Sequence, residues 1–192
     1  MNTPSDWELV ARARVGDDQA FGMLVRRYEQ GLIAFCHRMV GSRDDAEDLA
    51  QDCFLRVYRY LGRLRPEAKF STVLFGMARN LVLNFLRDAK RRGRYRTQSL
   101  TDDDALQDRV YNPLDSPDNR ARLRELEERL GCALERLSPE HREILLLREL
   151  NGLDYDAIAA VIRRRKGTVR SRLARAREQF RIRWLELGGG EL

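Results

Sequence analysis

Apolar residues recur at helical spacing along almost the whole chain, and this periodicity restricts the fold more than any other feature of the sequence. Residues 17–40 would place on one helix face Phe21, Leu24, Val25, Tyr28, Leu32 and Phe35. Similar patterns predict further helices over residues 44–61, 71–92, 118–137, 139–150, 154–162 and 167–185. No strand pattern of convincing length interrupts them, so we expect an all-α fold.

Residues suited to helix ends agree with these limits. Ser5 and the glutamate three residues later have the spacing of a capping box, which predicts a first short helix. Ser42 is a predicted N-cap for the helix over 44–61, and Gly62 is expected to end that helix. Ser138 precedes a proline, the order that is favoured at an N-cap and first helical position.

The segment of residues 101–119 differs from the rest of the chain. It holds six aspartates and two prolines without a helical period, which is typical of a flexible linker. A chain of 192 residues is long enough for two small domains. We therefore predict two helical domains, over residues 1–95 and 121–187, joined by a flexible acidic linker over 96–120. The C-terminal domain is expected to be a helix-turn-helix.

The composition disfavours several classes of protein. No segment approaches the roughly 18 apolar residues of a membrane span, and the N-terminus lacks the pattern of a signal peptide, so we expect no membrane insertion and a cytoplasmic protein. Cys36, Cys53 and Cys132 lie at mainly apolar helical positions and are predicted to be reduced core residues rather than redox sensors. They make no metal-ligand spacing with His37 or His141, and we expect no metal and no cofactor.

Charge is unevenly distributed along a chain whose formal net charge is +6. Residues 163–183 carry ten Lys and Arg against one acid, and residues 87–96 carry six against one acid. By contrast, residues 44–52 carry five acids and no base. Two basic segments and one acidic segment indicate separate surfaces for separate partners, and the positive net charge is compatible with nucleic acid as one of them.

The C-terminal basic segment has the organisation of a helix-turn-helix. A short helix over 154–162 precedes a basic helix over 167–185, which has only a narrow apolar stripe for docking on a core. In such modules the second helix enters the major groove. The candidates for base edges and flanking phosphates are then Thr168, Arg170, Ser171, Arg172 and Arg175. Charge alone also fits a solvated surface helix.

The acidic segment predicts a helix with a different outward surface. Opposite its apolar face lie Asp48, Gln51, Asp52 and Arg59, with Leu55 among them. A single exposed leucine is ordinary in a soluble protein. Ringed by carboxylates, it also resembles the apolar anchor of a protein-binding site, and the residues alone leave both interpretations open.

Four segments carry a resemblance to a known family: DAEDLAQDCFLRVYRYL (45–61), FSTVLFGMARNLVLNFLRDAKRR (70–92), LERLSPEHREILLLRELNGLDYDAIAAVI (134–162) and KGTVRSRLARARE (166–178). In this order and spacing, they resemble the extracytoplasmic-function (ECF) sigma factors, a group of the sigma-70 family of bacterial transcription initiation factors. With residues 17–40, the similarity covers nearly the whole chain except the linker and tails. It implies a protein that binds core RNA polymerase, directs it to promoters through −35 and −10 elements and promotes promoter melting, and that is not an enzyme.

The resemblance assigns a partner to each surface. In the family, the helix matching residues 44–61 docks on the coiled coil of the polymerase β′ subunit, which gives as core-binding candidates Asp44, Asp45, Asp48, Gln51, Asp52, Leu55 and Arg59. The part matching residues 62–92 opens the −10 element and holds an unpaired base, and its candidates are Lys69, Phe70, Ser71, Arg79, Asn80, Asn84, Arg87, Arg91 and Arg92.

The second domain would read the −35 element and touch the β flap tip. Its DNA-binding candidates are Arg163, Arg164, Arg165, Lys166, Thr168, Arg170, Ser171, Arg172 and Arg175. Promoter DNA and core polymerase are thus the implied partners. The family also implies an anti-sigma factor as a further partner, for which the surface around Leu55 would be a target.

Some positions depart from the family or leave alternatives open. Phe70 fits either the pocket for the unpaired base or the core, and Asn80 fits either that pocket or the plain surface. Val73 stands where a tryptophan is often found. The turn before the basic helix reads Arg163–Lys166 in place of a glycine and apolar residues, so the preceding helix continues or the turn is reshaped. A left-handed residue other than glycine costs about 1 kcal/mol there, and we expect these four cations to contact phosphate.

Two other classes of protein are weighed against this interpretation. A dimeric DNA-binding regulator using only residues 134–185 would recognise a palindrome, and it leaves residues 44–61 and 70–92 unexplained. An enzyme is disfavoured, since the sequence has no paired carboxylates in a pocket context, no phosphate-binding glycine loop and no Cys/His dyad.

In the family the linker threads through the polymerase, and residues 101–119 fit either that path or a solubilising spacer.

Overall fold

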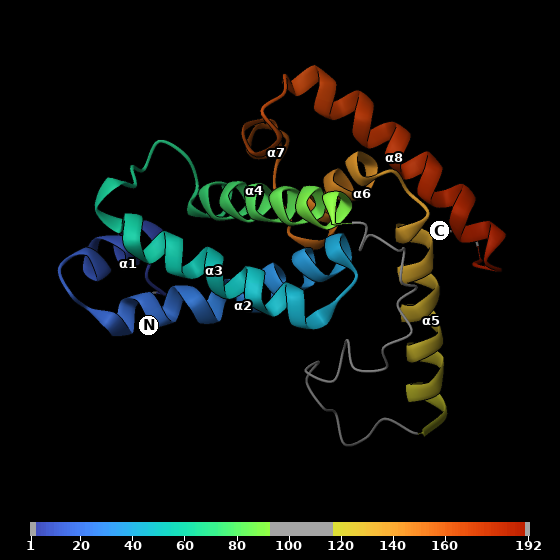
Figure 1. Cartoon of the computed structure of the whole chain (residues 1–192), viewed down its shortest axis with the longest axis horizontal. Helices are drawn as coiled ribbons and strands as arrows, with labels where there is room; N and C mark the ends of the chain where they lie inside the picture. Colours follow the sequence, from blue (N-terminus) through green and yellow to red (C-terminus); the bar gives the residue numbers. More distant parts are fainter. Residues whose placement is uncertain (1–2, 93–116, 191–192) are drawn as a thin grey trace.

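The computed structural model of the protein describes residues 3–92 and 117–190. These residues form helices and connecting turns without strands, which confirms the predicted all-α fold (Figure 1). The elements are α1 (Asp6–Arg14), α2 (Asp18–Val40), α3 (Arg43–Tyr60), the 3₁₀ turn η1 (Leu61–Arg63), α4 (Phe70–Arg91), α5 (Pro117–Glu135), α6 (Pro139–Leu145), the π-helical turn η2 (Leu146–Leu150), α7 (Tyr155–Ile162) and α8 (Lys166–Glu186). The predicted linker lies outside the described residues, except that α5 begins within its last residues.

The predicted caps begin the helices as expected. Ser5 forms a complete capping box at α1, Ser42 caps α3, and Ser138 caps α6 with a proline in the first turn. Each cap accepts a hydrogen bond from a backbone N–H that the helix leaves unpaired, worth about 1 kcal/mol. The prediction for Gly62 is wrong: α3 already ends at Tyr60, and Gly62 lies inside η1 without the positive φ of a glycine cap.

The helix predicted over residues 139–150 is divided in the structure. It is α-helical in α6 and then widens into the π-helical turn η2. The carbonyl of Leu146 accepts both the backbone N–H of Asn151, at 3.1 Å, and its side-chain amide, at 3.0 Å. These two hydrogen bonds span five residues and so hold the last turn in the wider form.

Helices α2, α3 and α4 enclose the core of the N-terminal half (residues 3–92). Phe35 and Phe75 meet edge to face in this core, with ring centroids 5.7 Å apart. Cys36 and Cys53 are also buried there, and burial raises the pKa of both thiols to about 12. They therefore stay protonated at neutral pH, while Cys132 is half-buried.

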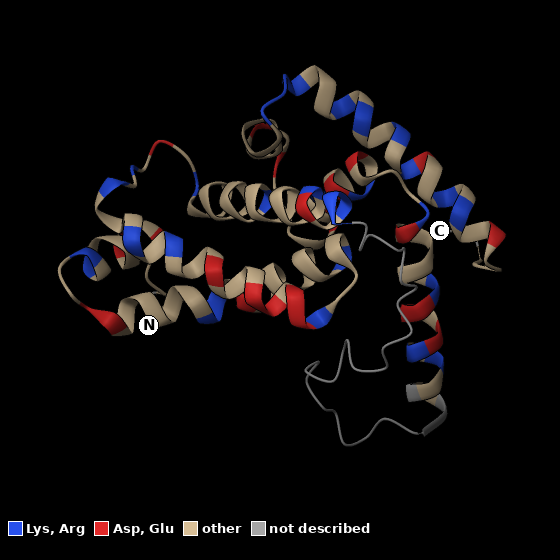
Figure 2. Ribbon diagram, in the orientation of Figure 1, with Lys and Arg blue, Asp and Glu red and all other residues tan. Residues whose placement is uncertain are grey.

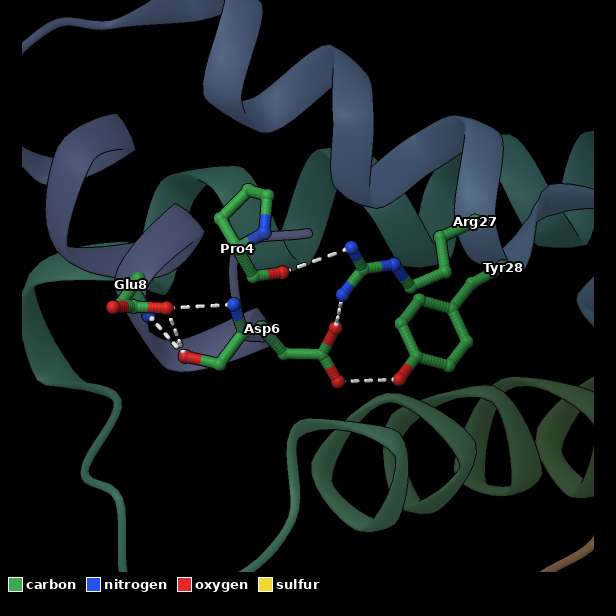
Figure 3. Close-up of polar contacts among 6 residues, drawn as sticks. Pro4, Asp6, Glu8, Arg27 and Tyr28 are labelled. Atoms are coloured by element: carbon green, nitrogen blue, oxygen red, sulfur yellow. Dashed lines mark hydrogen bonds and ion pairs between the residues drawn. The ribbon is translucent and has the colours of Figure 1, made fainter. Parts of the chain in front are cut away.

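A polar cluster ties the N-terminal segment to α2 (Figure 3). Arg27 donates to the carbonyl of Pro4 over 3.0 Å and pairs with the carboxylate of Asp6. The same carboxylate accepts a hydrogen bond from Tyr28. Burial, followed by the contact with Asp6, raises the pKa of Tyr28, so its hydroxyl remains a donor. The cluster fixes the start of α1 against the side of α2.

Helix α1 in turn supports the loop that leads into α4. The indole of Trp7 donates to the carbonyl of Ala68 over 3.0 Å, and its ring meets Phe70 edge to face at a centroid distance of 6.3 Å. Arg14 donates to the carbonyl of Leu61 over 2.8 Å. The loop between η1 and α4 is therefore held at both of its ends.

The C-terminal half (residues 117–190) contains the predicted helix-turn-helix. Helices α6 and α7 both pack against α8, and α5 packs along α8 as well. Leu147, Ile158 and Leu173 are fully buried where these elements meet. The described core of this half thus includes apolar residues of η2, α7 and α8.

The two halves pack against each other (Figure 1). Helix α4 contacts α7, and α2 contacts α5, α6 and η2. Arg142 donates across the interface to the carbonyl of Arg38 over 3.3 Å. Gly31 marks a close approach, because a Cβ there would lie 3.0 Å from the side-chain oxygen of Asn151. The two halves thus form a closed arrangement that contains both predicted DNA-binding helices, α4 and α8.

Candidate polymerase-binding and DNA-binding surfaces

Helix α3 presents an acidic face to solvent along its N-terminal part (Figure 2). Its buried positions are apolar, whereas Asp45 is half-buried and the other predicted core-binding residues are exposed: Asp44, Asp48, Gln51, Asp52, Leu55 and Arg59. Leu55 leaves 47% of its surface accessible. Acids in the first turn also stabilise the helix through its dipole. The exposed side chain of Leu55 is thus surrounded by acidic residues, and this surface is complementary to a basic surface on a partner.

The C-terminal end of α3 has the opposite charge. Arg56, Arg59, Tyr60 and Arg63 line a hollow of about 470 Å³. The guanidinium of Arg63 lies 5.7 Å from the ring centroid of Tyr60, within the range of a cation–π contact. Of these residues only Arg59 was predicted from the sequence, although their spacing of three, four and seven residues already places them on one face. The predicted core-binding surface therefore changes sign along α3.

The residues predicted to bind the −10 element fall into two groups in the structure. Along the second half and the end of α4, five of them are exposed: Asn80, Asn84, Arg87, Arg91 and Arg92. Nearer the start of α4, Phe70 is only 1% exposed and packs against Tyr28 at a centroid distance of 5.5 Å. Phe70 is thus a core residue here, and its ring is not presented for stacking on a base. Ser71 and Val73 are partly buried beside it.

Two further members of the −10 set are paired with carboxylates of the C-terminal half. Lys69 Nζ lies 2.8 Å from Asp154 Oδ2, and Arg79 Nε lies 2.5 Å from Glu143 Oε1. The hydrogen bond from Lys69 and the bond from the backbone of Ala157 lower the pKa of Asp154, which also caps α7. Burial raises the pKa of Glu143 against the opposing charge of Arg79. Neither carboxylate was singled out by the sequence analysis.

The arginine-rich turn between α7 and α8 is a left-handed helix end. Helix α7 ends at Ile162, and Arg163 has φ 53° and ψ 51°. The N–H of Arg164 then returns to the carbonyl of Ala159 over 3.0 Å. The alternative in which α7 runs on is therefore excluded. The turn keeps the geometry that favours glycine and places an arginine in it.

Lys and Arg are concentrated in the turn before α8 and along α8 (Figure 2). Val169, Leu173 and Ala176 are buried against the other helices of the C-terminal half. The exposed members of the set are Arg163, Arg164, Arg165, Lys166, Thr168, Arg170, Ser171 and Arg175. Arg172 differs, because its side chain is only 19% exposed and lies 2.9 Å from Glu140 of α6. The basic helix thus combines one partly buried arginine with a broad exposed cationic surface.

An apolar groove of about 650 Å³ opens between the two halves and was not predicted from the sequence. Its walls come from α2, α5, the α6–η2 segment and α8, and the lining includes Ile33, Leu126, Leu130, Leu146, Leu150 and Phe180. Part of the signal was present in the sequence, since Leu123, Leu126 and Leu130 lie on one side of α5 and remain exposed. The other wall depends on how the halves pack.

The described residues show no site of another kind. Among them, no group of three or more His, Cys, Asp and Glu side chains could hold a metal ion. In the same part of the chain, no helix combines the length and apolar character needed to span a bilayer.

Comparisons with known proteins match a family model to each half of the chain. The family model for sigma-70 region 2 matches residues 24–92, and the model for sigma-70 region 4 matches residues 127–180. The RNA polymerase sigma-H factor of Pseudomonas aeruginosa is 37% identical over 175 residues, which cover 90% of each chain. The ECF RNA polymerase sigma-E factor of Haemophilus influenzae is 36% identical over 179 residues, covering 92% of this chain and 93% of that one.

Solved structures give the same result. The complex of CnrH with the cytosolic domain of CnrY contains a chain that matches with a TM-score of 0.67 and 25% identity, over 92% of this chain and 95% of that one. The sigma factor RpoE of Bartonella quintana, in complex with the anti-sigma factor NepR, matches with a TM-score of 0.62 and 25% identity, over 86% of this chain and 96% of that one. With both sigma regions present in order and relatives this similar along their lengths, the chain belongs to the ECF sigma factors of the sigma-70 family.

Proposed function

We propose that this sigma factor binds core RNA polymerase through α3, reads the −10 element with α4 and the −35 element with α8, and thereby starts transcription at specific promoters. The observation that carries the proposal is the presence of both sigma regions in one chain, with the assigned face exposed on α3 and on α8. The functional units we propose are residues 1–95 and 121–187, connected by residues 96–120.

Each surface has a physical task in this proposal. On α8, an arginine can bond both acceptors of a guanine edge, a contact worth about 1–3 kcal/mol of discrimination. The cations of the preceding turn neutralise phosphates and make binding sensitive to salt. On α4, Asn80 and Asn84 provide hydrogen-bonding groups for an unpaired base, and the arginines at the end of the helix hold the backbone. The protein supplies recognition, and the polymerase carries out the chemistry.

An anti-sigma factor is the further partner we propose. One of the similar solved structures is a complex of this kind by name, RpoE with the anti-sigma factor NepR, and another is CnrH in complex with the cytosolic domain of CnrY. The exposed Leu55 and its acidic rim form the surface that such a protein would have to cover to exclude the polymerase. We place both interactions in the cytoplasm, where transcription takes place.

The proposal is tested by transcription in vitro on sheared genomic DNA with purified core polymerase, followed by sequencing of the RNA 5′ ends. We expect start sites that depend on this protein and share two motifs at a fixed spacing. These motifs would also give the promoter sequence. The absence of protein-dependent starts, together with tight binding to a palindrome, would contradict the proposal in favour of a regulator that uses the helix-turn-helix alone.

A further inference from the structure

A buried ion pair joins the two halves of the chain. Arg79 comes from α4 and Glu143 from α6, and their side chains are 19% and 4% exposed. Charges removed from water to this extent carry a large desolvation cost, which is offset only by a close opposite charge. The pair therefore stabilises the closed arrangement only while both partners are present.

Glu143 also lies close to the recognition helix. The positive charge of Arg172 on α8 acts to lower the pKa of Glu143. Arg172 also forms an ion pair with Glu140, which lies one turn earlier on α6. Glu143 thus pairs with an arginine assigned to −10 DNA and lies in the field of an arginine assigned to −35 DNA. A second ion pair joins the halves at the start of α4, where Lys69 is paired with Asp154 of the C-terminal half. That second pair is largely exposed and contributes less.

A carboxylate held against arginine presents the same charge and acceptor geometry as a phosphate oxygen. In the closed arrangement, Glu143 occupies the position in which Arg79 would meet a DNA backbone. Helix α7 of the same C-terminal half also packs on α4. Promoter DNA and the C-terminal half therefore compete for one surface of α4.

We propose that Glu143 is an intramolecular latch: it binds Arg79 as a substitute for DNA phosphate and holds the free sigma factor closed until the polymerase separates the two halves. The assignment of Arg79 to DNA rests on the proposed function. The latch itself rests on the contact between the halves. The closed protein keeps the acidic face of α3 accessible, so the polymerase can bind before the latch opens.

The test uses the full chain with the substitution Glu143→Gln, which keeps the shape of the side chain and removes its charge. Leaving Arg79 buried without a counter-charge should open the halves. We expect a larger radius of gyration by small-angle X-ray scattering. We also expect labelling of Arg79 by phenylglyoxal, followed by mass spectrometry, to be at least about tenfold faster.

The matched control is Glu149→Gln, the same substitution in the same half. Glu149 pairs over 2.6 Å with Arg177, but both side chains are about half exposed and both belong to the C-terminal half. This control should leave the scattering and the labelling of Arg79 unchanged. Far-UV circular dichroism checks that both variants keep their helices.

A second variant guards against simple misfolding. Exchanging the two charges, Arg79→Glu with Glu143→Arg, should restore the closed radius of gyration. Unchanged scattering and labelling in Glu143→Gln would overturn the latch, and so would equal opening in Glu149→Gln. If Glu143→Gln opens the chain but its affinity for a labelled oligonucleotide of the −10 non-template strand does not rise, the latch stands and the role of Arg79 in −10 binding is contradicted.

Discussion

Replacing Arg163 by glycine is expected to stabilise the protein, because Arg163 is the single non-glycine residue with a positive φ among residues 3–92 and 117–190. Its φ of 53° and ψ of 51° lie in the left-handed region, where the Cβ of an L-residue crowds the following carbonyl. The side chain is exposed, so its removal takes away little packing. The change therefore acts mainly on the backbone.

The size of the effect follows from two opposing contributions. Relief of the left-handed conformation contributes about 1–2 kcal/mol, whereas the greater freedom of glycine in the unfolded chain costs about 0.4–1 kcal/mol. The net expectation is a gain of about 0.5–1 kcal/mol in the free energy of unfolding. For a chain of 192 residues, each kcal/mol raises Tm by about 2–4 °C.

The matched control is Arg164→Gly, one position further along. Arg164 does not have a positive φ, so this variant keeps the unfolded-state cost without the relief and should be less stable than the natural protein. The difference between the two glycine variants isolates the conformational cost, about 1–2 kcal/mol. Thermal unfolding followed by circular dichroism measures it. Equal destabilisation by both substitutions would refute a conformational cost of Arg163 in the left-handed region.

Three other predictions test the surfaces and the core. Leu55→Asp should abolish association with core polymerase in a pull-down while the helix content stays unchanged. The control Val15→Asp, at a position that is 86% exposed and outside the predicted sites, should have no effect. Unchanged association of Leu55→Asp would contradict the assignment of α3 to core binding. Arg175→Ala should weaken binding to −35 variants unequally, with about 1–3 kcal/mol lost where a base contact is broken; a uniform loss in a binding titration would make it a phosphate contact. Burial, and then the charges of two neighbouring arginines, lower the pKa of His37 below its usual 6.5. The folded protein therefore resists protonation there, and stability should fall as pH decreases through about 6.5. Urea titrations should show a weaker pH dependence for His37→Gln, and an unchanged dependence would contradict this origin.

Features set by short-range patterns could be predicted from the sequence. The helix starts at Ser42 and Ser138 were predictable because a cap and its N–H lie within one turn. The exposed face of α3 was predictable because the helical period alone assigns residues to its two sides. The left-handed turn at Arg163 was one of two stated alternatives, and only the structure decides between them.

Features set by distant contacts could not be predicted in this way. Lys69 and Asp154 are 85 residues apart in sequence, and no local pattern marks them as partners. Phe70 lies in the core because Trp7 and Tyr28 pack on it from two other helices. The sequence around Phe70 left both the core and the DNA-binding pocket open for its ring.

Because α1 supports the loop before α4, the start of the family match and the start of the structural unit fall at different residues. The match to sigma-70 region 2 begins at residue 24, yet Trp7 and Arg14 hold the carbonyls on either side of that loop. A fragment trimmed to the family match would keep every residue assigned to the −10 element and lose the brace that positions Lys69 and the start of α4. The smallest piece that keeps this brace therefore begins near Ser5, well before the start of the region 2 family match.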